Sequence, residues 1–444
     1  MQAIPTTLSR YGLSQIINHL LGLDPSRPFD FIIQEDLVRQ DLHTHLRKHA
    51  LSTEAVIVVE YLPAVLPPQV KHHATQEDWI SAIAPLPWGV VATGSYDGVV
   101  RFWRDGEEVE SGRFTAHGGP IKGAASLHST NLMVTVSHDG TGCVWHVRPD
   151  GTQEEANGSP IVPVALLKDH ATPLECCACG PSGMPRCVTA GWDGQLRIWE
   201  LDGVVDSLPE DLHEVLKKRK TTRQKKVSTS TADIKGQLTR LDPLVPLAVL
   251  AHAPPSSQEF IGPGPPPPSP HHCVTCVSWA SPDIIISGSW DHSIKVWDPS
   301  ISACVETLNH SKPVMCLATC PTGEPGTLVA FGGSERALRL WDRRQSHPDT
   351  LGLGALSPSA HEGWISALAW HPTSSHHLLS ASHDGSIKLW DLRTAVPLHQ
   401  ISSEPSDNAE MTKLLCCSWI GNNEFAWGGT DKILHTASVE VSLQ

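Results

Sequence analysis

Short apolar strands separated by polar turns recur along most of the chain. The unit is clearest at residues 360–391, where Trp364 to Trp370, Leu378 to Ser382 and Ile387 to Asp391 read as strands. Period-two alternation of apolar and polar positions, interrupted by Gly, Asp and Pro turns, predicts antiparallel β-strands. Short strands at even spacing are typical of four-stranded blades, so we expect a mainly β fold.

Tryptophan closes six of these units, a few residues after a turn built on an acidic residue. The acid and tryptophan pairs are Asp97/Trp103, Asp139/Trp145, Asp193/Trp199, Asp291/Trp297, Glu335/Trp341 and Asp384/Trp390. A seventh unit has Asp431, and we assign His435 to the place of its tryptophan. The tryptophans are 42, 54, 98, 44 and 49 residues apart, which fits a repeat of about 40 to 45 residues once insertions are removed. Seven similar units predict a closed ring.

Two insertions lengthen the repeat. Residues 202–246 are polar and basic with little strand pattern, and we expect them to be disordered. Residues 253–270 contain the run Pro265 to Pro268, which cannot supply ladder donors and is expected to form a stiff arm or a spacer. Because turns alternate between the two rims of a ring, the basic insertion should leave from the rim opposite the aspartate turns.

These units resemble the WD-repeat β-propeller family from residue 78 to about residue 438. The resemblance implies a buried polar chain in each blade, in which a histidine bonds to the turn aspartate and a strand Ser or Thr bonds to the tryptophan. The matching sets are His117/Asp139/Trp145, His170/Asp193/Trp199, His252/Asp291/Trp297 and His361/Asp384/Trp390. Because one set recurs in each blade, we interpret it as a fastener and not as a catalytic site.

Two units depart from that pattern. The fifth unit has Glu335 beside His310, and the first unit has no such histidine. We expect these two blades to be held more by packing than by a polar chain.

The residue before each turn acid is expected to face one rim of the ring. Aromatic or imidazole side chains fill five of the seven positions, at Tyr96, His138, Trp192, Trp290 and His383, and the other two are Ser334 and Thr430. Since Trp and Tyr dominate interface energetics, this rim is a candidate protein-docking surface. Local packing of these side chains on their own turns is the alternative.

Charge restricts where a nucleic acid could bind. The 444 residues carry a formal net charge of -14 with only 18% charged residues, so a basic function must be local. Residues 217–226 hold seven positive charges: Lys217, Lys218, Arg219, Lys220, Arg223, Lys225 and Lys226. Such a run predicts a nuclear import signal or a contact with rRNA phosphates, with a solvated run of no role as the alternative.

Several classes of protein are not favoured. No stretch approaches the about 20 apolar residues of a membrane span, and no secretory signal pattern is present, so we expect an intracellular protein with no membrane contact. The twelve cysteines are expected to be thiols. The pairs Cys176/Cys179 and Cys273/Cys276 lie on predicted strands, where residues three apart point to opposite faces, which disfavours zinc. We find no P-loop, nucleophile elbow or HExxH motif, and we expect neither enzymatic activity nor a cofactor.

Residues 1–62 do not share the repeat. Ser14 to Leu21 reads as a helix, Phe29 to Ile33 and Ala55 to Leu62 as strands, and Asp41 to His49 as a short helix. This order is the second part of a ubiquitin-like β-grasp whose first hairpin is absent. Without that hairpin, Val56 to Val59 would form an unpaired apolar edge, and we therefore expect an incomplete amino terminus.

We expect residues 63–77 to connect this domain to a propeller at 78–438. The seventh blade needs a fourth strand, which either 62–70 or 438–443 could supply.

Several segments carry a closer resemblance: Tyr11 to Gly22, Pro28 to Phe31, Ala64 to Pro68 and Glu77 to Ser81. They resemble the Notchless-like domain and connector of the Ytm-type WD-repeat ribosome biogenesis factors. The resemblance implies a non-catalytic assembly factor of the large (60S) ribosomal subunit, required for rRNA processing in the nucleus, nucleolus and nucleoplasm. It implies a complex with a block-of-proliferation WD-repeat protein and a pescadillo homologue on the pre-60S particle.

The same resemblance assigns a role to Glu54, in Leu51 to Ala55. It implies that this carboxylate reaches the metal-ion-dependent adhesion site of midasin, an AAA ATPase that removes the factor from the particle. A carboxylate suits Mg²⁺, which prefers hard oxygen ligands. The metal would belong to midasin, so this chain alone is expected to bind none.

A substrate receptor of a cullin-type ubiquitin ligase is the alternative function. Two segments resemble the WDxR box of such receptors, at Trp341 to Arg344 and Trp390 to Arg393. An arginine at that place occurs in many propellers, so the box is weak support.

Overall fold

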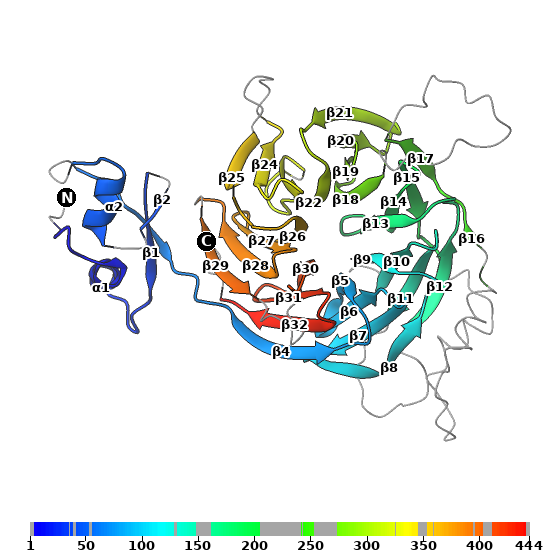
Figure 1. Cartoon of the computed structure of the whole chain (residues 1–444), viewed down its shortest axis with the longest axis horizontal. Helices are drawn as coiled ribbons and strands as arrows, with labels where there is room; N and C mark the ends of the chain where they lie inside the picture. Colours follow the sequence, from blue (N-terminus) through cyan, green and yellow to red (C-terminus); the bar gives the residue numbers. More distant parts are fainter. Residues whose placement is uncertain are drawn as a thin grey trace.

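The computed structural model describes residues 4–34, 36–38, 41–52, 56–127, 131–147, 161–204, 241, 243–252, 273–324, 326–344, 353–357, 359–393, 396–402 and 411–440. A small N-terminal domain lies beside a ring of seven antiparallel sheets (Figure 1). Glu54, the basic run at 217–226 and the proline-rich loop at 253–270 lie outside the described residues. The mainly β, seven-bladed fold predicted from the sequence is confirmed.

The N-terminal domain packs two helices on a three-stranded sheet. Its elements are α1 (Arg10–Leu21), β1 (Phe29–Ile33), β2 (Asp36–Leu37), α2 (Leu42–Lys48) and β3 (Glu60–Pro63), with sheet order β2-β1-β3. Gly22 ends α1 in the left-handed region at φ 62°, which glycine adopts without steric cost. Asp41 caps α2 by accepting a bond from the Thr44 backbone. The central strand β1 is buried along its whole length.

The strand predicted from Ala55 to Leu62 begins only at Glu60. Ile57 and Val59 pack against the domain core, whereas Val56 and Val58 are exposed, so the alternation is present without a strand. The predicted unpaired strand edge at 56–59 is therefore wrong. Alternate apolar side chains reach the core from an extended segment that pairs with no strand among the described residues.

Each blade of the propeller contains four main strands, which in blades 1 to 6 follow sequence order from the centre outward. Blade 1 contains β5 (Ile80–Pro85), β6 (Val90–Ser95), β7 (Val99–Arg104) and β8 (Glu107–Thr115). Blade 2 contains β9 (Ile121–Leu127), β10 (Leu132–Ser137), β11 (Gly142–Val147) and β12 (Ile161–Leu167). Blade 3 contains β13 (Leu174–Cys179), β14 (Arg186–Gly191), β15 (Gln195–Glu200) and β17 (Ala248–Ala251). A two-residue strand, β16 (Pro243–Leu244), adds to blade 2 beside β12.

Blades 4 to 6 have the same strand order, and blade 7 takes its outer strand from the segment before blade 1. Blade 4 contains β18 (Val274–Ser281), β19 (Ile284–Ser289), β20 (Ser293–Asp298) and β21 (Ala303–Asn309). Blade 5 contains β22 (Val314–Thr319), β23 (Leu328–Gly333), β24 (Leu338–Asp342) and β25 (Leu353–Ser357). Blade 6 contains β26 (Ile365–Trp370), β27 (His377–Ser382), β28 (Ser386–Asp391) and β29 (Pro397–Ser402). Blade 7 contains β30 (Leu414–Trp419), β31 (Glu424–Gly429), β32 (Ile433–Ser438) and, from before the ring, β4 (Gln69–Thr75).

The strand β4 closes the ring. It pairs antiparallel with β32, from Thr75 opposite Ile433 to Gln69 opposite Ser438. Residues 69–75 therefore belong to the propeller, and the predicted connector 63–77 and ring boundary at residue 78 need correction. The segment 62–70 overlaps β4 only at its end, and Ser438 belongs to β32. An outer strand is largely exposed, so the polar sequence of β4 gives no apolar signal.

The hydrophobic cores lie between neighbouring blades. Phe102 and Phe114 of blade 1, for example, pack with Trp145 of blade 2, and the Phe114 and Trp145 rings are 5.9 Å apart. All twelve cysteines are free thiols. Neither α1 nor α2 has the length and apolarity needed to cross a membrane, and the described part of the chain contains no other candidate span.

Candidate functional site

The histidine and aspartate sets make buried polar chains inside the blades. In blade 3 His170 places its Nδ1 2.9 Å from Asp193 and its Nε2 2.9 Å from Thr189, whose hydroxyl also accepts from Trp199 at 2.8 Å. Blade 6 has the same chain. His361 lies 3.0 Å from Asp384 and 2.7 Å from Ser380, and Trp390 donates to Ser380 at 2.8 Å.

Blades 2 and 4 hold looser versions of this chain. His117 is 3.7 Å from Asp139 and meets the hydroxyls of Thr141 and Thr135 at 3.1 and 2.9 Å, and Trp145 donates to Thr135 at 2.9 Å. In blade 4 His252 lies 3.1 Å from Asp291, and Trp297 donates to Ser287 at 2.8 Å. The buried Nε2 of His252 has no hydrogen-bond partner among the described residues.

These chains have the electrostatics of fasteners. Burial alone would raise the pKa of Asp384, but the hydrogen bonds from His361 and Ser386 outweigh it and hold the pKa well below its usual range. Burial lowers the pKa of His170, so the imidazole stays neutral near pH 7. These histidines are buried, and each bonds to groups of the turn and strands that it fastens. We therefore interpret the sets as structural.

Blade 1 does have a polar chain, contrary to the expectation that packing would replace it. The amide of Gln76 takes the histidine's place and donates to Thr93 at 2.8 Å, and Trp103 donates to the same hydroxyl at 2.9 Å. The sequence hid this because Gln76 follows β4, in the segment assigned to a connector. Blade 5 fits the expectation better, since Phe331 stands where blades 1 to 4 and 6 have Ser or Thr and meets His310 edge-on at 5.4 Å.

In blade 7 the strand register corrects the place given to His435. Phe425 pairs with Ala437, as Val91 pairs with Trp103 in blade 1, so Ala437 is the tryptophan equivalent. His435 is instead the residue four after the turn aspartate and lies 2.7 Å from Asp431. The tryptophan of this blade has moved to β31, where Trp427 stacks on His435 with ring centroids 5.2 Å apart.

A set of aromatic and imidazole side chains gathers on the rim formed by the aspartate turns. We define this aromatic rim as Trp79, Tyr96, His138, Trp192, Trp290, Trp364 and His383. Trp79 and Trp364, which directly precede the inner strands β5 and β26, were missed in the sequence because only the turns were searched. Trp79, Trp192, Trp290 and Trp364 expose 41%, 36%, 41% and 46% of their surface.

Backbone bonds fix the rim. The N–H of Tyr96 donates to the carbonyl of Trp79 at 3.0 Å, and that of His383 donates to Trp364 at 2.9 Å. Their rings meet as well, with centroids 5.3 Å apart for Trp79 and Tyr96 and 6.0 Å apart for the stacked Trp364 and His383. The equivalent bonds hold His138, Trp192 and Trp290.

A partly buried carboxylate joins the rim across three blades. Glu175 of blade 3 accepts from Trp192 Nε1 and lies at hydrogen-bond distance from His138 Nε2, both at 2.7 Å. Lys122 lies 3.6 Å from Glu175 and donates to the Tyr96 hydroxyl at 3.1 Å. Burial would raise the pKa of Glu175, but His138, Lys122 and Trp192 together lower it. Rim side chains held in this way lose little entropy when a partner binds.

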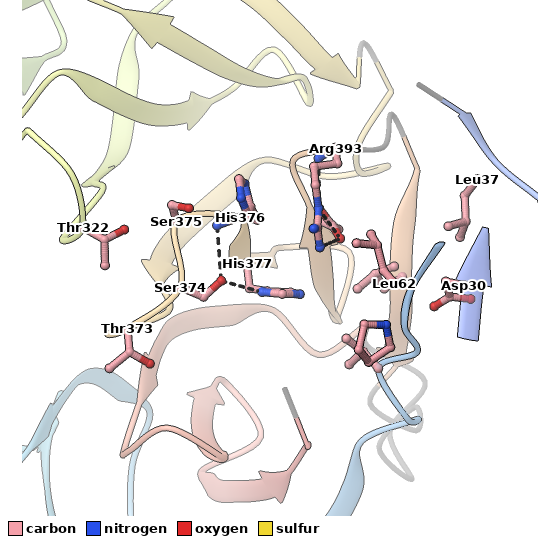
Figure 2. Close-up of a pocket in the computed structure, with 14 residues that line it drawn as sticks. Asp30, Leu37, Leu62, Thr322, Thr373, Ser374, Ser375, His376, His377 and Arg393 are labelled. Carbon is pink, nitrogen blue, oxygen red and sulfur yellow. Dashed lines mark hydrogen bonds and ion pairs between the residues drawn. The ribbon is translucent and has the colours of Figure 1, made fainter. Parts of the chain in front are cut away.

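A cleft separates the N-terminal domain from the opposite rim of blade 6 (Figure 2). Its volume is about 260 Å³. Asp30 and Leu37 line one side, and His377 and Arg393 line the other. Arg393 is held by two hydrogen bonds to Asp391, at 2.9 and 2.8 Å, and His377 bonds to Ser374 at 2.7 Å.

The family models match both parts of the chain. The model of the NLE (NUC135) domain matches residues 2–46. The model of the WD domain, G-beta repeat, matches residues 67–104, 108–146, 161–200, 268–298 and 355–391. The first repeat match begins near β4, in agreement with a ring that includes this strand.

Relatives match the chain along most of its length. "Ribosome biogenesis protein WDR12 homolog" of Chlamydomonas reinhardtii is 38% identical over 439 residues, which cover 95% of this chain and 88% of that protein. The chain belongs to the WDR12/YTM1 family of ribosome biogenesis proteins. The WDR12 homolog of Arabidopsis thaliana is 31% identical, covering 98% of this chain and 92% of its own. "Ribosome biogenesis protein YTM1" of Saccharomyces cerevisiae (strain ATCC 204508 / S288c) is 30% identical, covering 96% and 91%.

Membership of the WDR12/YTM1 family confirms the resemblance drawn from the N-terminal segments and the repeats. In this chain the NLE domain precedes the strand that closes the WD-repeat ring. The aromatic rim and the NLE domain are the two candidate sites that a ribosome biogenesis protein of this build offers to other molecules.

Proposed function

We propose that this chain is a non-catalytic assembly factor of the large ribosomal subunit, which docks by its aromatic rim to the propeller of a block-of-proliferation protein. A pescadillo homologue joins through that protein, and the complex sits on pre-60S particles in the nucleolus and nucleoplasm. The midasin ATPase then removes the factor by gripping Glu54. Membership of a ribosome biogenesis family supports the general role.

The rim carries the docking half of this proposal. Four partly exposed tryptophans on one rim offer the residue type that most often anchors protein interfaces. Glu175 holds Trp192 and His138 in place before any partner arrives. A propeller partner supplies a surface of comparable width, which a small ligand would not.

Chain order supports Glu54 as the grip. The residue lies between α2, which ends at Lys48, and β3, which begins at Glu60, and β3 continues directly toward β4. A carboxylate is a hard oxygen ligand that can fill an open vertex of a Mg²⁺ site on another protein. A pull on Glu54 would reach the ring through a short stretch of chain.

The cullin-ligase alternative is less favoured by the arginines of its two boxes. Arg344 bonds to Asp342 at 2.9 and 2.8 Å, and Arg393 bonds to Asp391 in the same way inside the cleft. Each guanidinium is already paired, and Arg393 faces the N-terminal domain, where an adaptor would have to displace it.

Affinity purification of the tagged full chain tests the proposed function. We expect recovery of the block-of-proliferation and pescadillo homologues together with pre-60S rRNA, and loss of these partners in a Trp192→Ala/Trp290→Ala variant. The matched control is Ile301→Ala, which removes an exposed apolar side chain of blade 4 away from the rim. Recovery of a cullin and its adaptor, with no ribosomal particle, would contradict the proposal.

A further inference from the structure

The strand that closes the ring is also the strand that leads to the N-terminal domain. Figure 1 shows β4 running along blade 7 after the chain leaves that domain. The ladder between β4 and β32 comprises six paired positions, from Gln69 to Thr75. We call this ladder between β4 and β32 the seam of the ring. A force that pulls on the N-terminal domain therefore also acts on the seam.

Within the described part of the chain, the segment before β4 links the N-terminal domain to the ring. Ala64 donates to Pro28 of the domain at 3.0 Å, and the next residue, Val65, accepts a bond from His399 of blade 6 at 2.9 Å. Where the domain and blade 6 face each other, the cleft of about 260 Å³ interrupts their contact (Figure 2). We therefore expect tension on the domain to be carried along residues 60–75.

The seam contains polar side-chain contacts that close only when β4 is in place. His73 of β4 and His435 of β32 approach to 2.7 Å between their Nδ1 atoms, and Lys71 pairs with Glu424. Each partner belongs to the last blade, more than 300 residues along the chain. These contacts are lost together when β4 leaves.

The end of β4 leads on to the aromatic rim. The N–H of Gln76 donates to Lys432 at 2.7 Å, and its side chain supports the Thr93 hydroxyl of blade 1 at 2.8 Å. Glu77 then pairs with Arg113 of blade 1 at 2.5 Å. Two residues later Trp79 meets Tyr96 edge to face, with ring centroids 5.3 Å apart.

From this continuous path we infer that β4 is a releasable clasp: tension on the N-terminal domain opens the ring at the seam between β4 and β32, and the opening loosens the aromatic rim at blade 1. The coupling is a property of the fold, and its use in removal from the particle rests on the proposed function. The factor would then dissociate because its docking surface changes conformation. Force would not have to separate two surfaces that still fit each other.

Equivalent cysteines on two inner strands report where the ring opens. Cys416 of blade 7 lies at the boundary between the last and first blades, with its thiol 3.6 Å from the Ile80 carbonyl of blade 1. Cys176 of blade 3 makes the same contact with Val274 of blade 4 at 3.7 Å. Both thiols are buried, and burial raises both pKa values well above the usual range.

The experiment labels these thiols in urea below the unfolding transition and maps them by mass spectrometry. We expect Cys416 to react at least tenfold faster than Cys176. The His73→Cys/His435→Cys variant, oxidised to a disulfide, should slow Cys416 to the rate of Cys176, and reduction should restore the fast rate. The matched control is Lys295→Cys/Thr307→Cys, the equivalent ladder pair of blade 4, which should leave Cys416 unchanged. Equal labelling rates of Cys416 and Cys176 in the unsubstituted chain would overturn the inference. Fast labelling of Cys416 in the oxidised variant would also overturn it.

The second arm uses pre-60S particles and the ATPase. The oxidised seam variant should be released at least tenfold more slowly than its reduced form, while oxidised and reduced blade 4 controls should be released alike. Equal release of the oxidised and reduced seam variants contradicts the clasp. If the unsubstituted chain is not released at all while Cys416 still labels first, the proposed function fails and the clasp stands.

Discussion

The imidazole rings of His73 and His435 meet across the ring closure, with their Nδ1 atoms 2.7 Å apart. One residue precedes the first complete blade and the other lies in the last, so the two ends of the repeat are joined by side chains as well as by a strand ladder. Burial lowers the pKa of His73, and the neighbouring His435 lowers it further, which keeps the pair from being doubly charged near neutral pH.

Replacing His73 by Ala should destabilise the propeller. The change leaves Nδ1 of His435 without its partner in a partly buried place, and an unsatisfied group of this kind costs about 1–3 kcal/mol. Urea unfolding measures the loss. His72→Ala is the matched control on the same strand, because His72 is exposed like His73 but only His73 contacts the His435 ring. A loss of equal size in both variants would contradict the assignment.

Thr189→Val should cost more than the loss of one hydrogen bond. Its hydroxyl serves both His170 and Trp199, so the nearly isosteric valine leaves two buried groups unpaired, at about 1–3 kcal/mol each. Thr189→Ser keeps the hydroxyl and is the control. Unfolding by urea should separate the two variants by about 2 kcal/mol or more, and indistinguishable midpoints would show that the polar chain contributes little.

Sequence patterns predicted the parts of this molecule that repeat. Six of the seven blades bury a tryptophan after a tight acidic turn, so the ring could be predicted from the spacing. The closing strand was missed because β4 is an exposed outer strand of polar residues, with only Ala74 buried. Gln76 was missed for a related reason, since a glutamine standing in for histidine carries no pattern of its own.

The candidate sites divide in the same way. Tyr96, His138, Trp192, Trp290 and His383 could be placed on one rim because turns alternate in a blade. Glu175 could not, because its contact with His138 and Trp192 depends on how blades 2 and 3 lie side by side. Trp364 lacked a signal in the turn pattern, although its place just before an inner strand could have revealed it.

Acid should destabilise the protein in part through His377. Burial, together with the nearby Arg393, lowers the pKa of His377 to about 4. The unfolded chain binds a proton near pH 6.5, so this contribution to stability is present above that pH and is lost as the pH falls toward 4. At pH 5 the loss is on the order of 1–2 kcal/mol. His377→Asn should reduce the difference in unfolding free energy between pH 7 and pH 5, whereas His19→Asn, on the exposed face of α1, should not. An unchanged difference in the His377 variant would contradict the prediction.

Trp290→Ala should weaken binding of the partner propeller by about 2 kcal/mol, since large exposed aromatics at the centre of a rim act as anchors. Trp290 exposes 41% of its surface, so the melting temperature should change little. Calorimetry with the purified partner measures the affinity, and Val305→Ala, an exposed apolar position on β21, is the control. Full affinity in the Trp290 variant would exclude this side chain from the interface.

Replacing the basic run by glutamine at Lys217, Lys218, Arg219, Lys220, Arg223, Lys225 and Lys226 should reduce nuclear accumulation. Removal of seven positive charges abolishes an import signal. A lysine-to-arginine version keeps the charge and is the control. Unchanged nucleolar fluorescence in the glutamine version would remove the import role, and lower rRNA cross-linking with normal import would favour an RNA contact.

The most direct measurement is release of the factor from purified pre-60S particles by the midasin ATPase and ATP. The account predicts that Glu54→Gln stays bound, because an amide is a poor ligand for Mg²⁺, while Glu60→Gln, an exposed glutamate at the start of β3, is released like the unsubstituted chain. Release of the Glu54 variant at the normal rate would contradict the claim that this carboxylate is the grip.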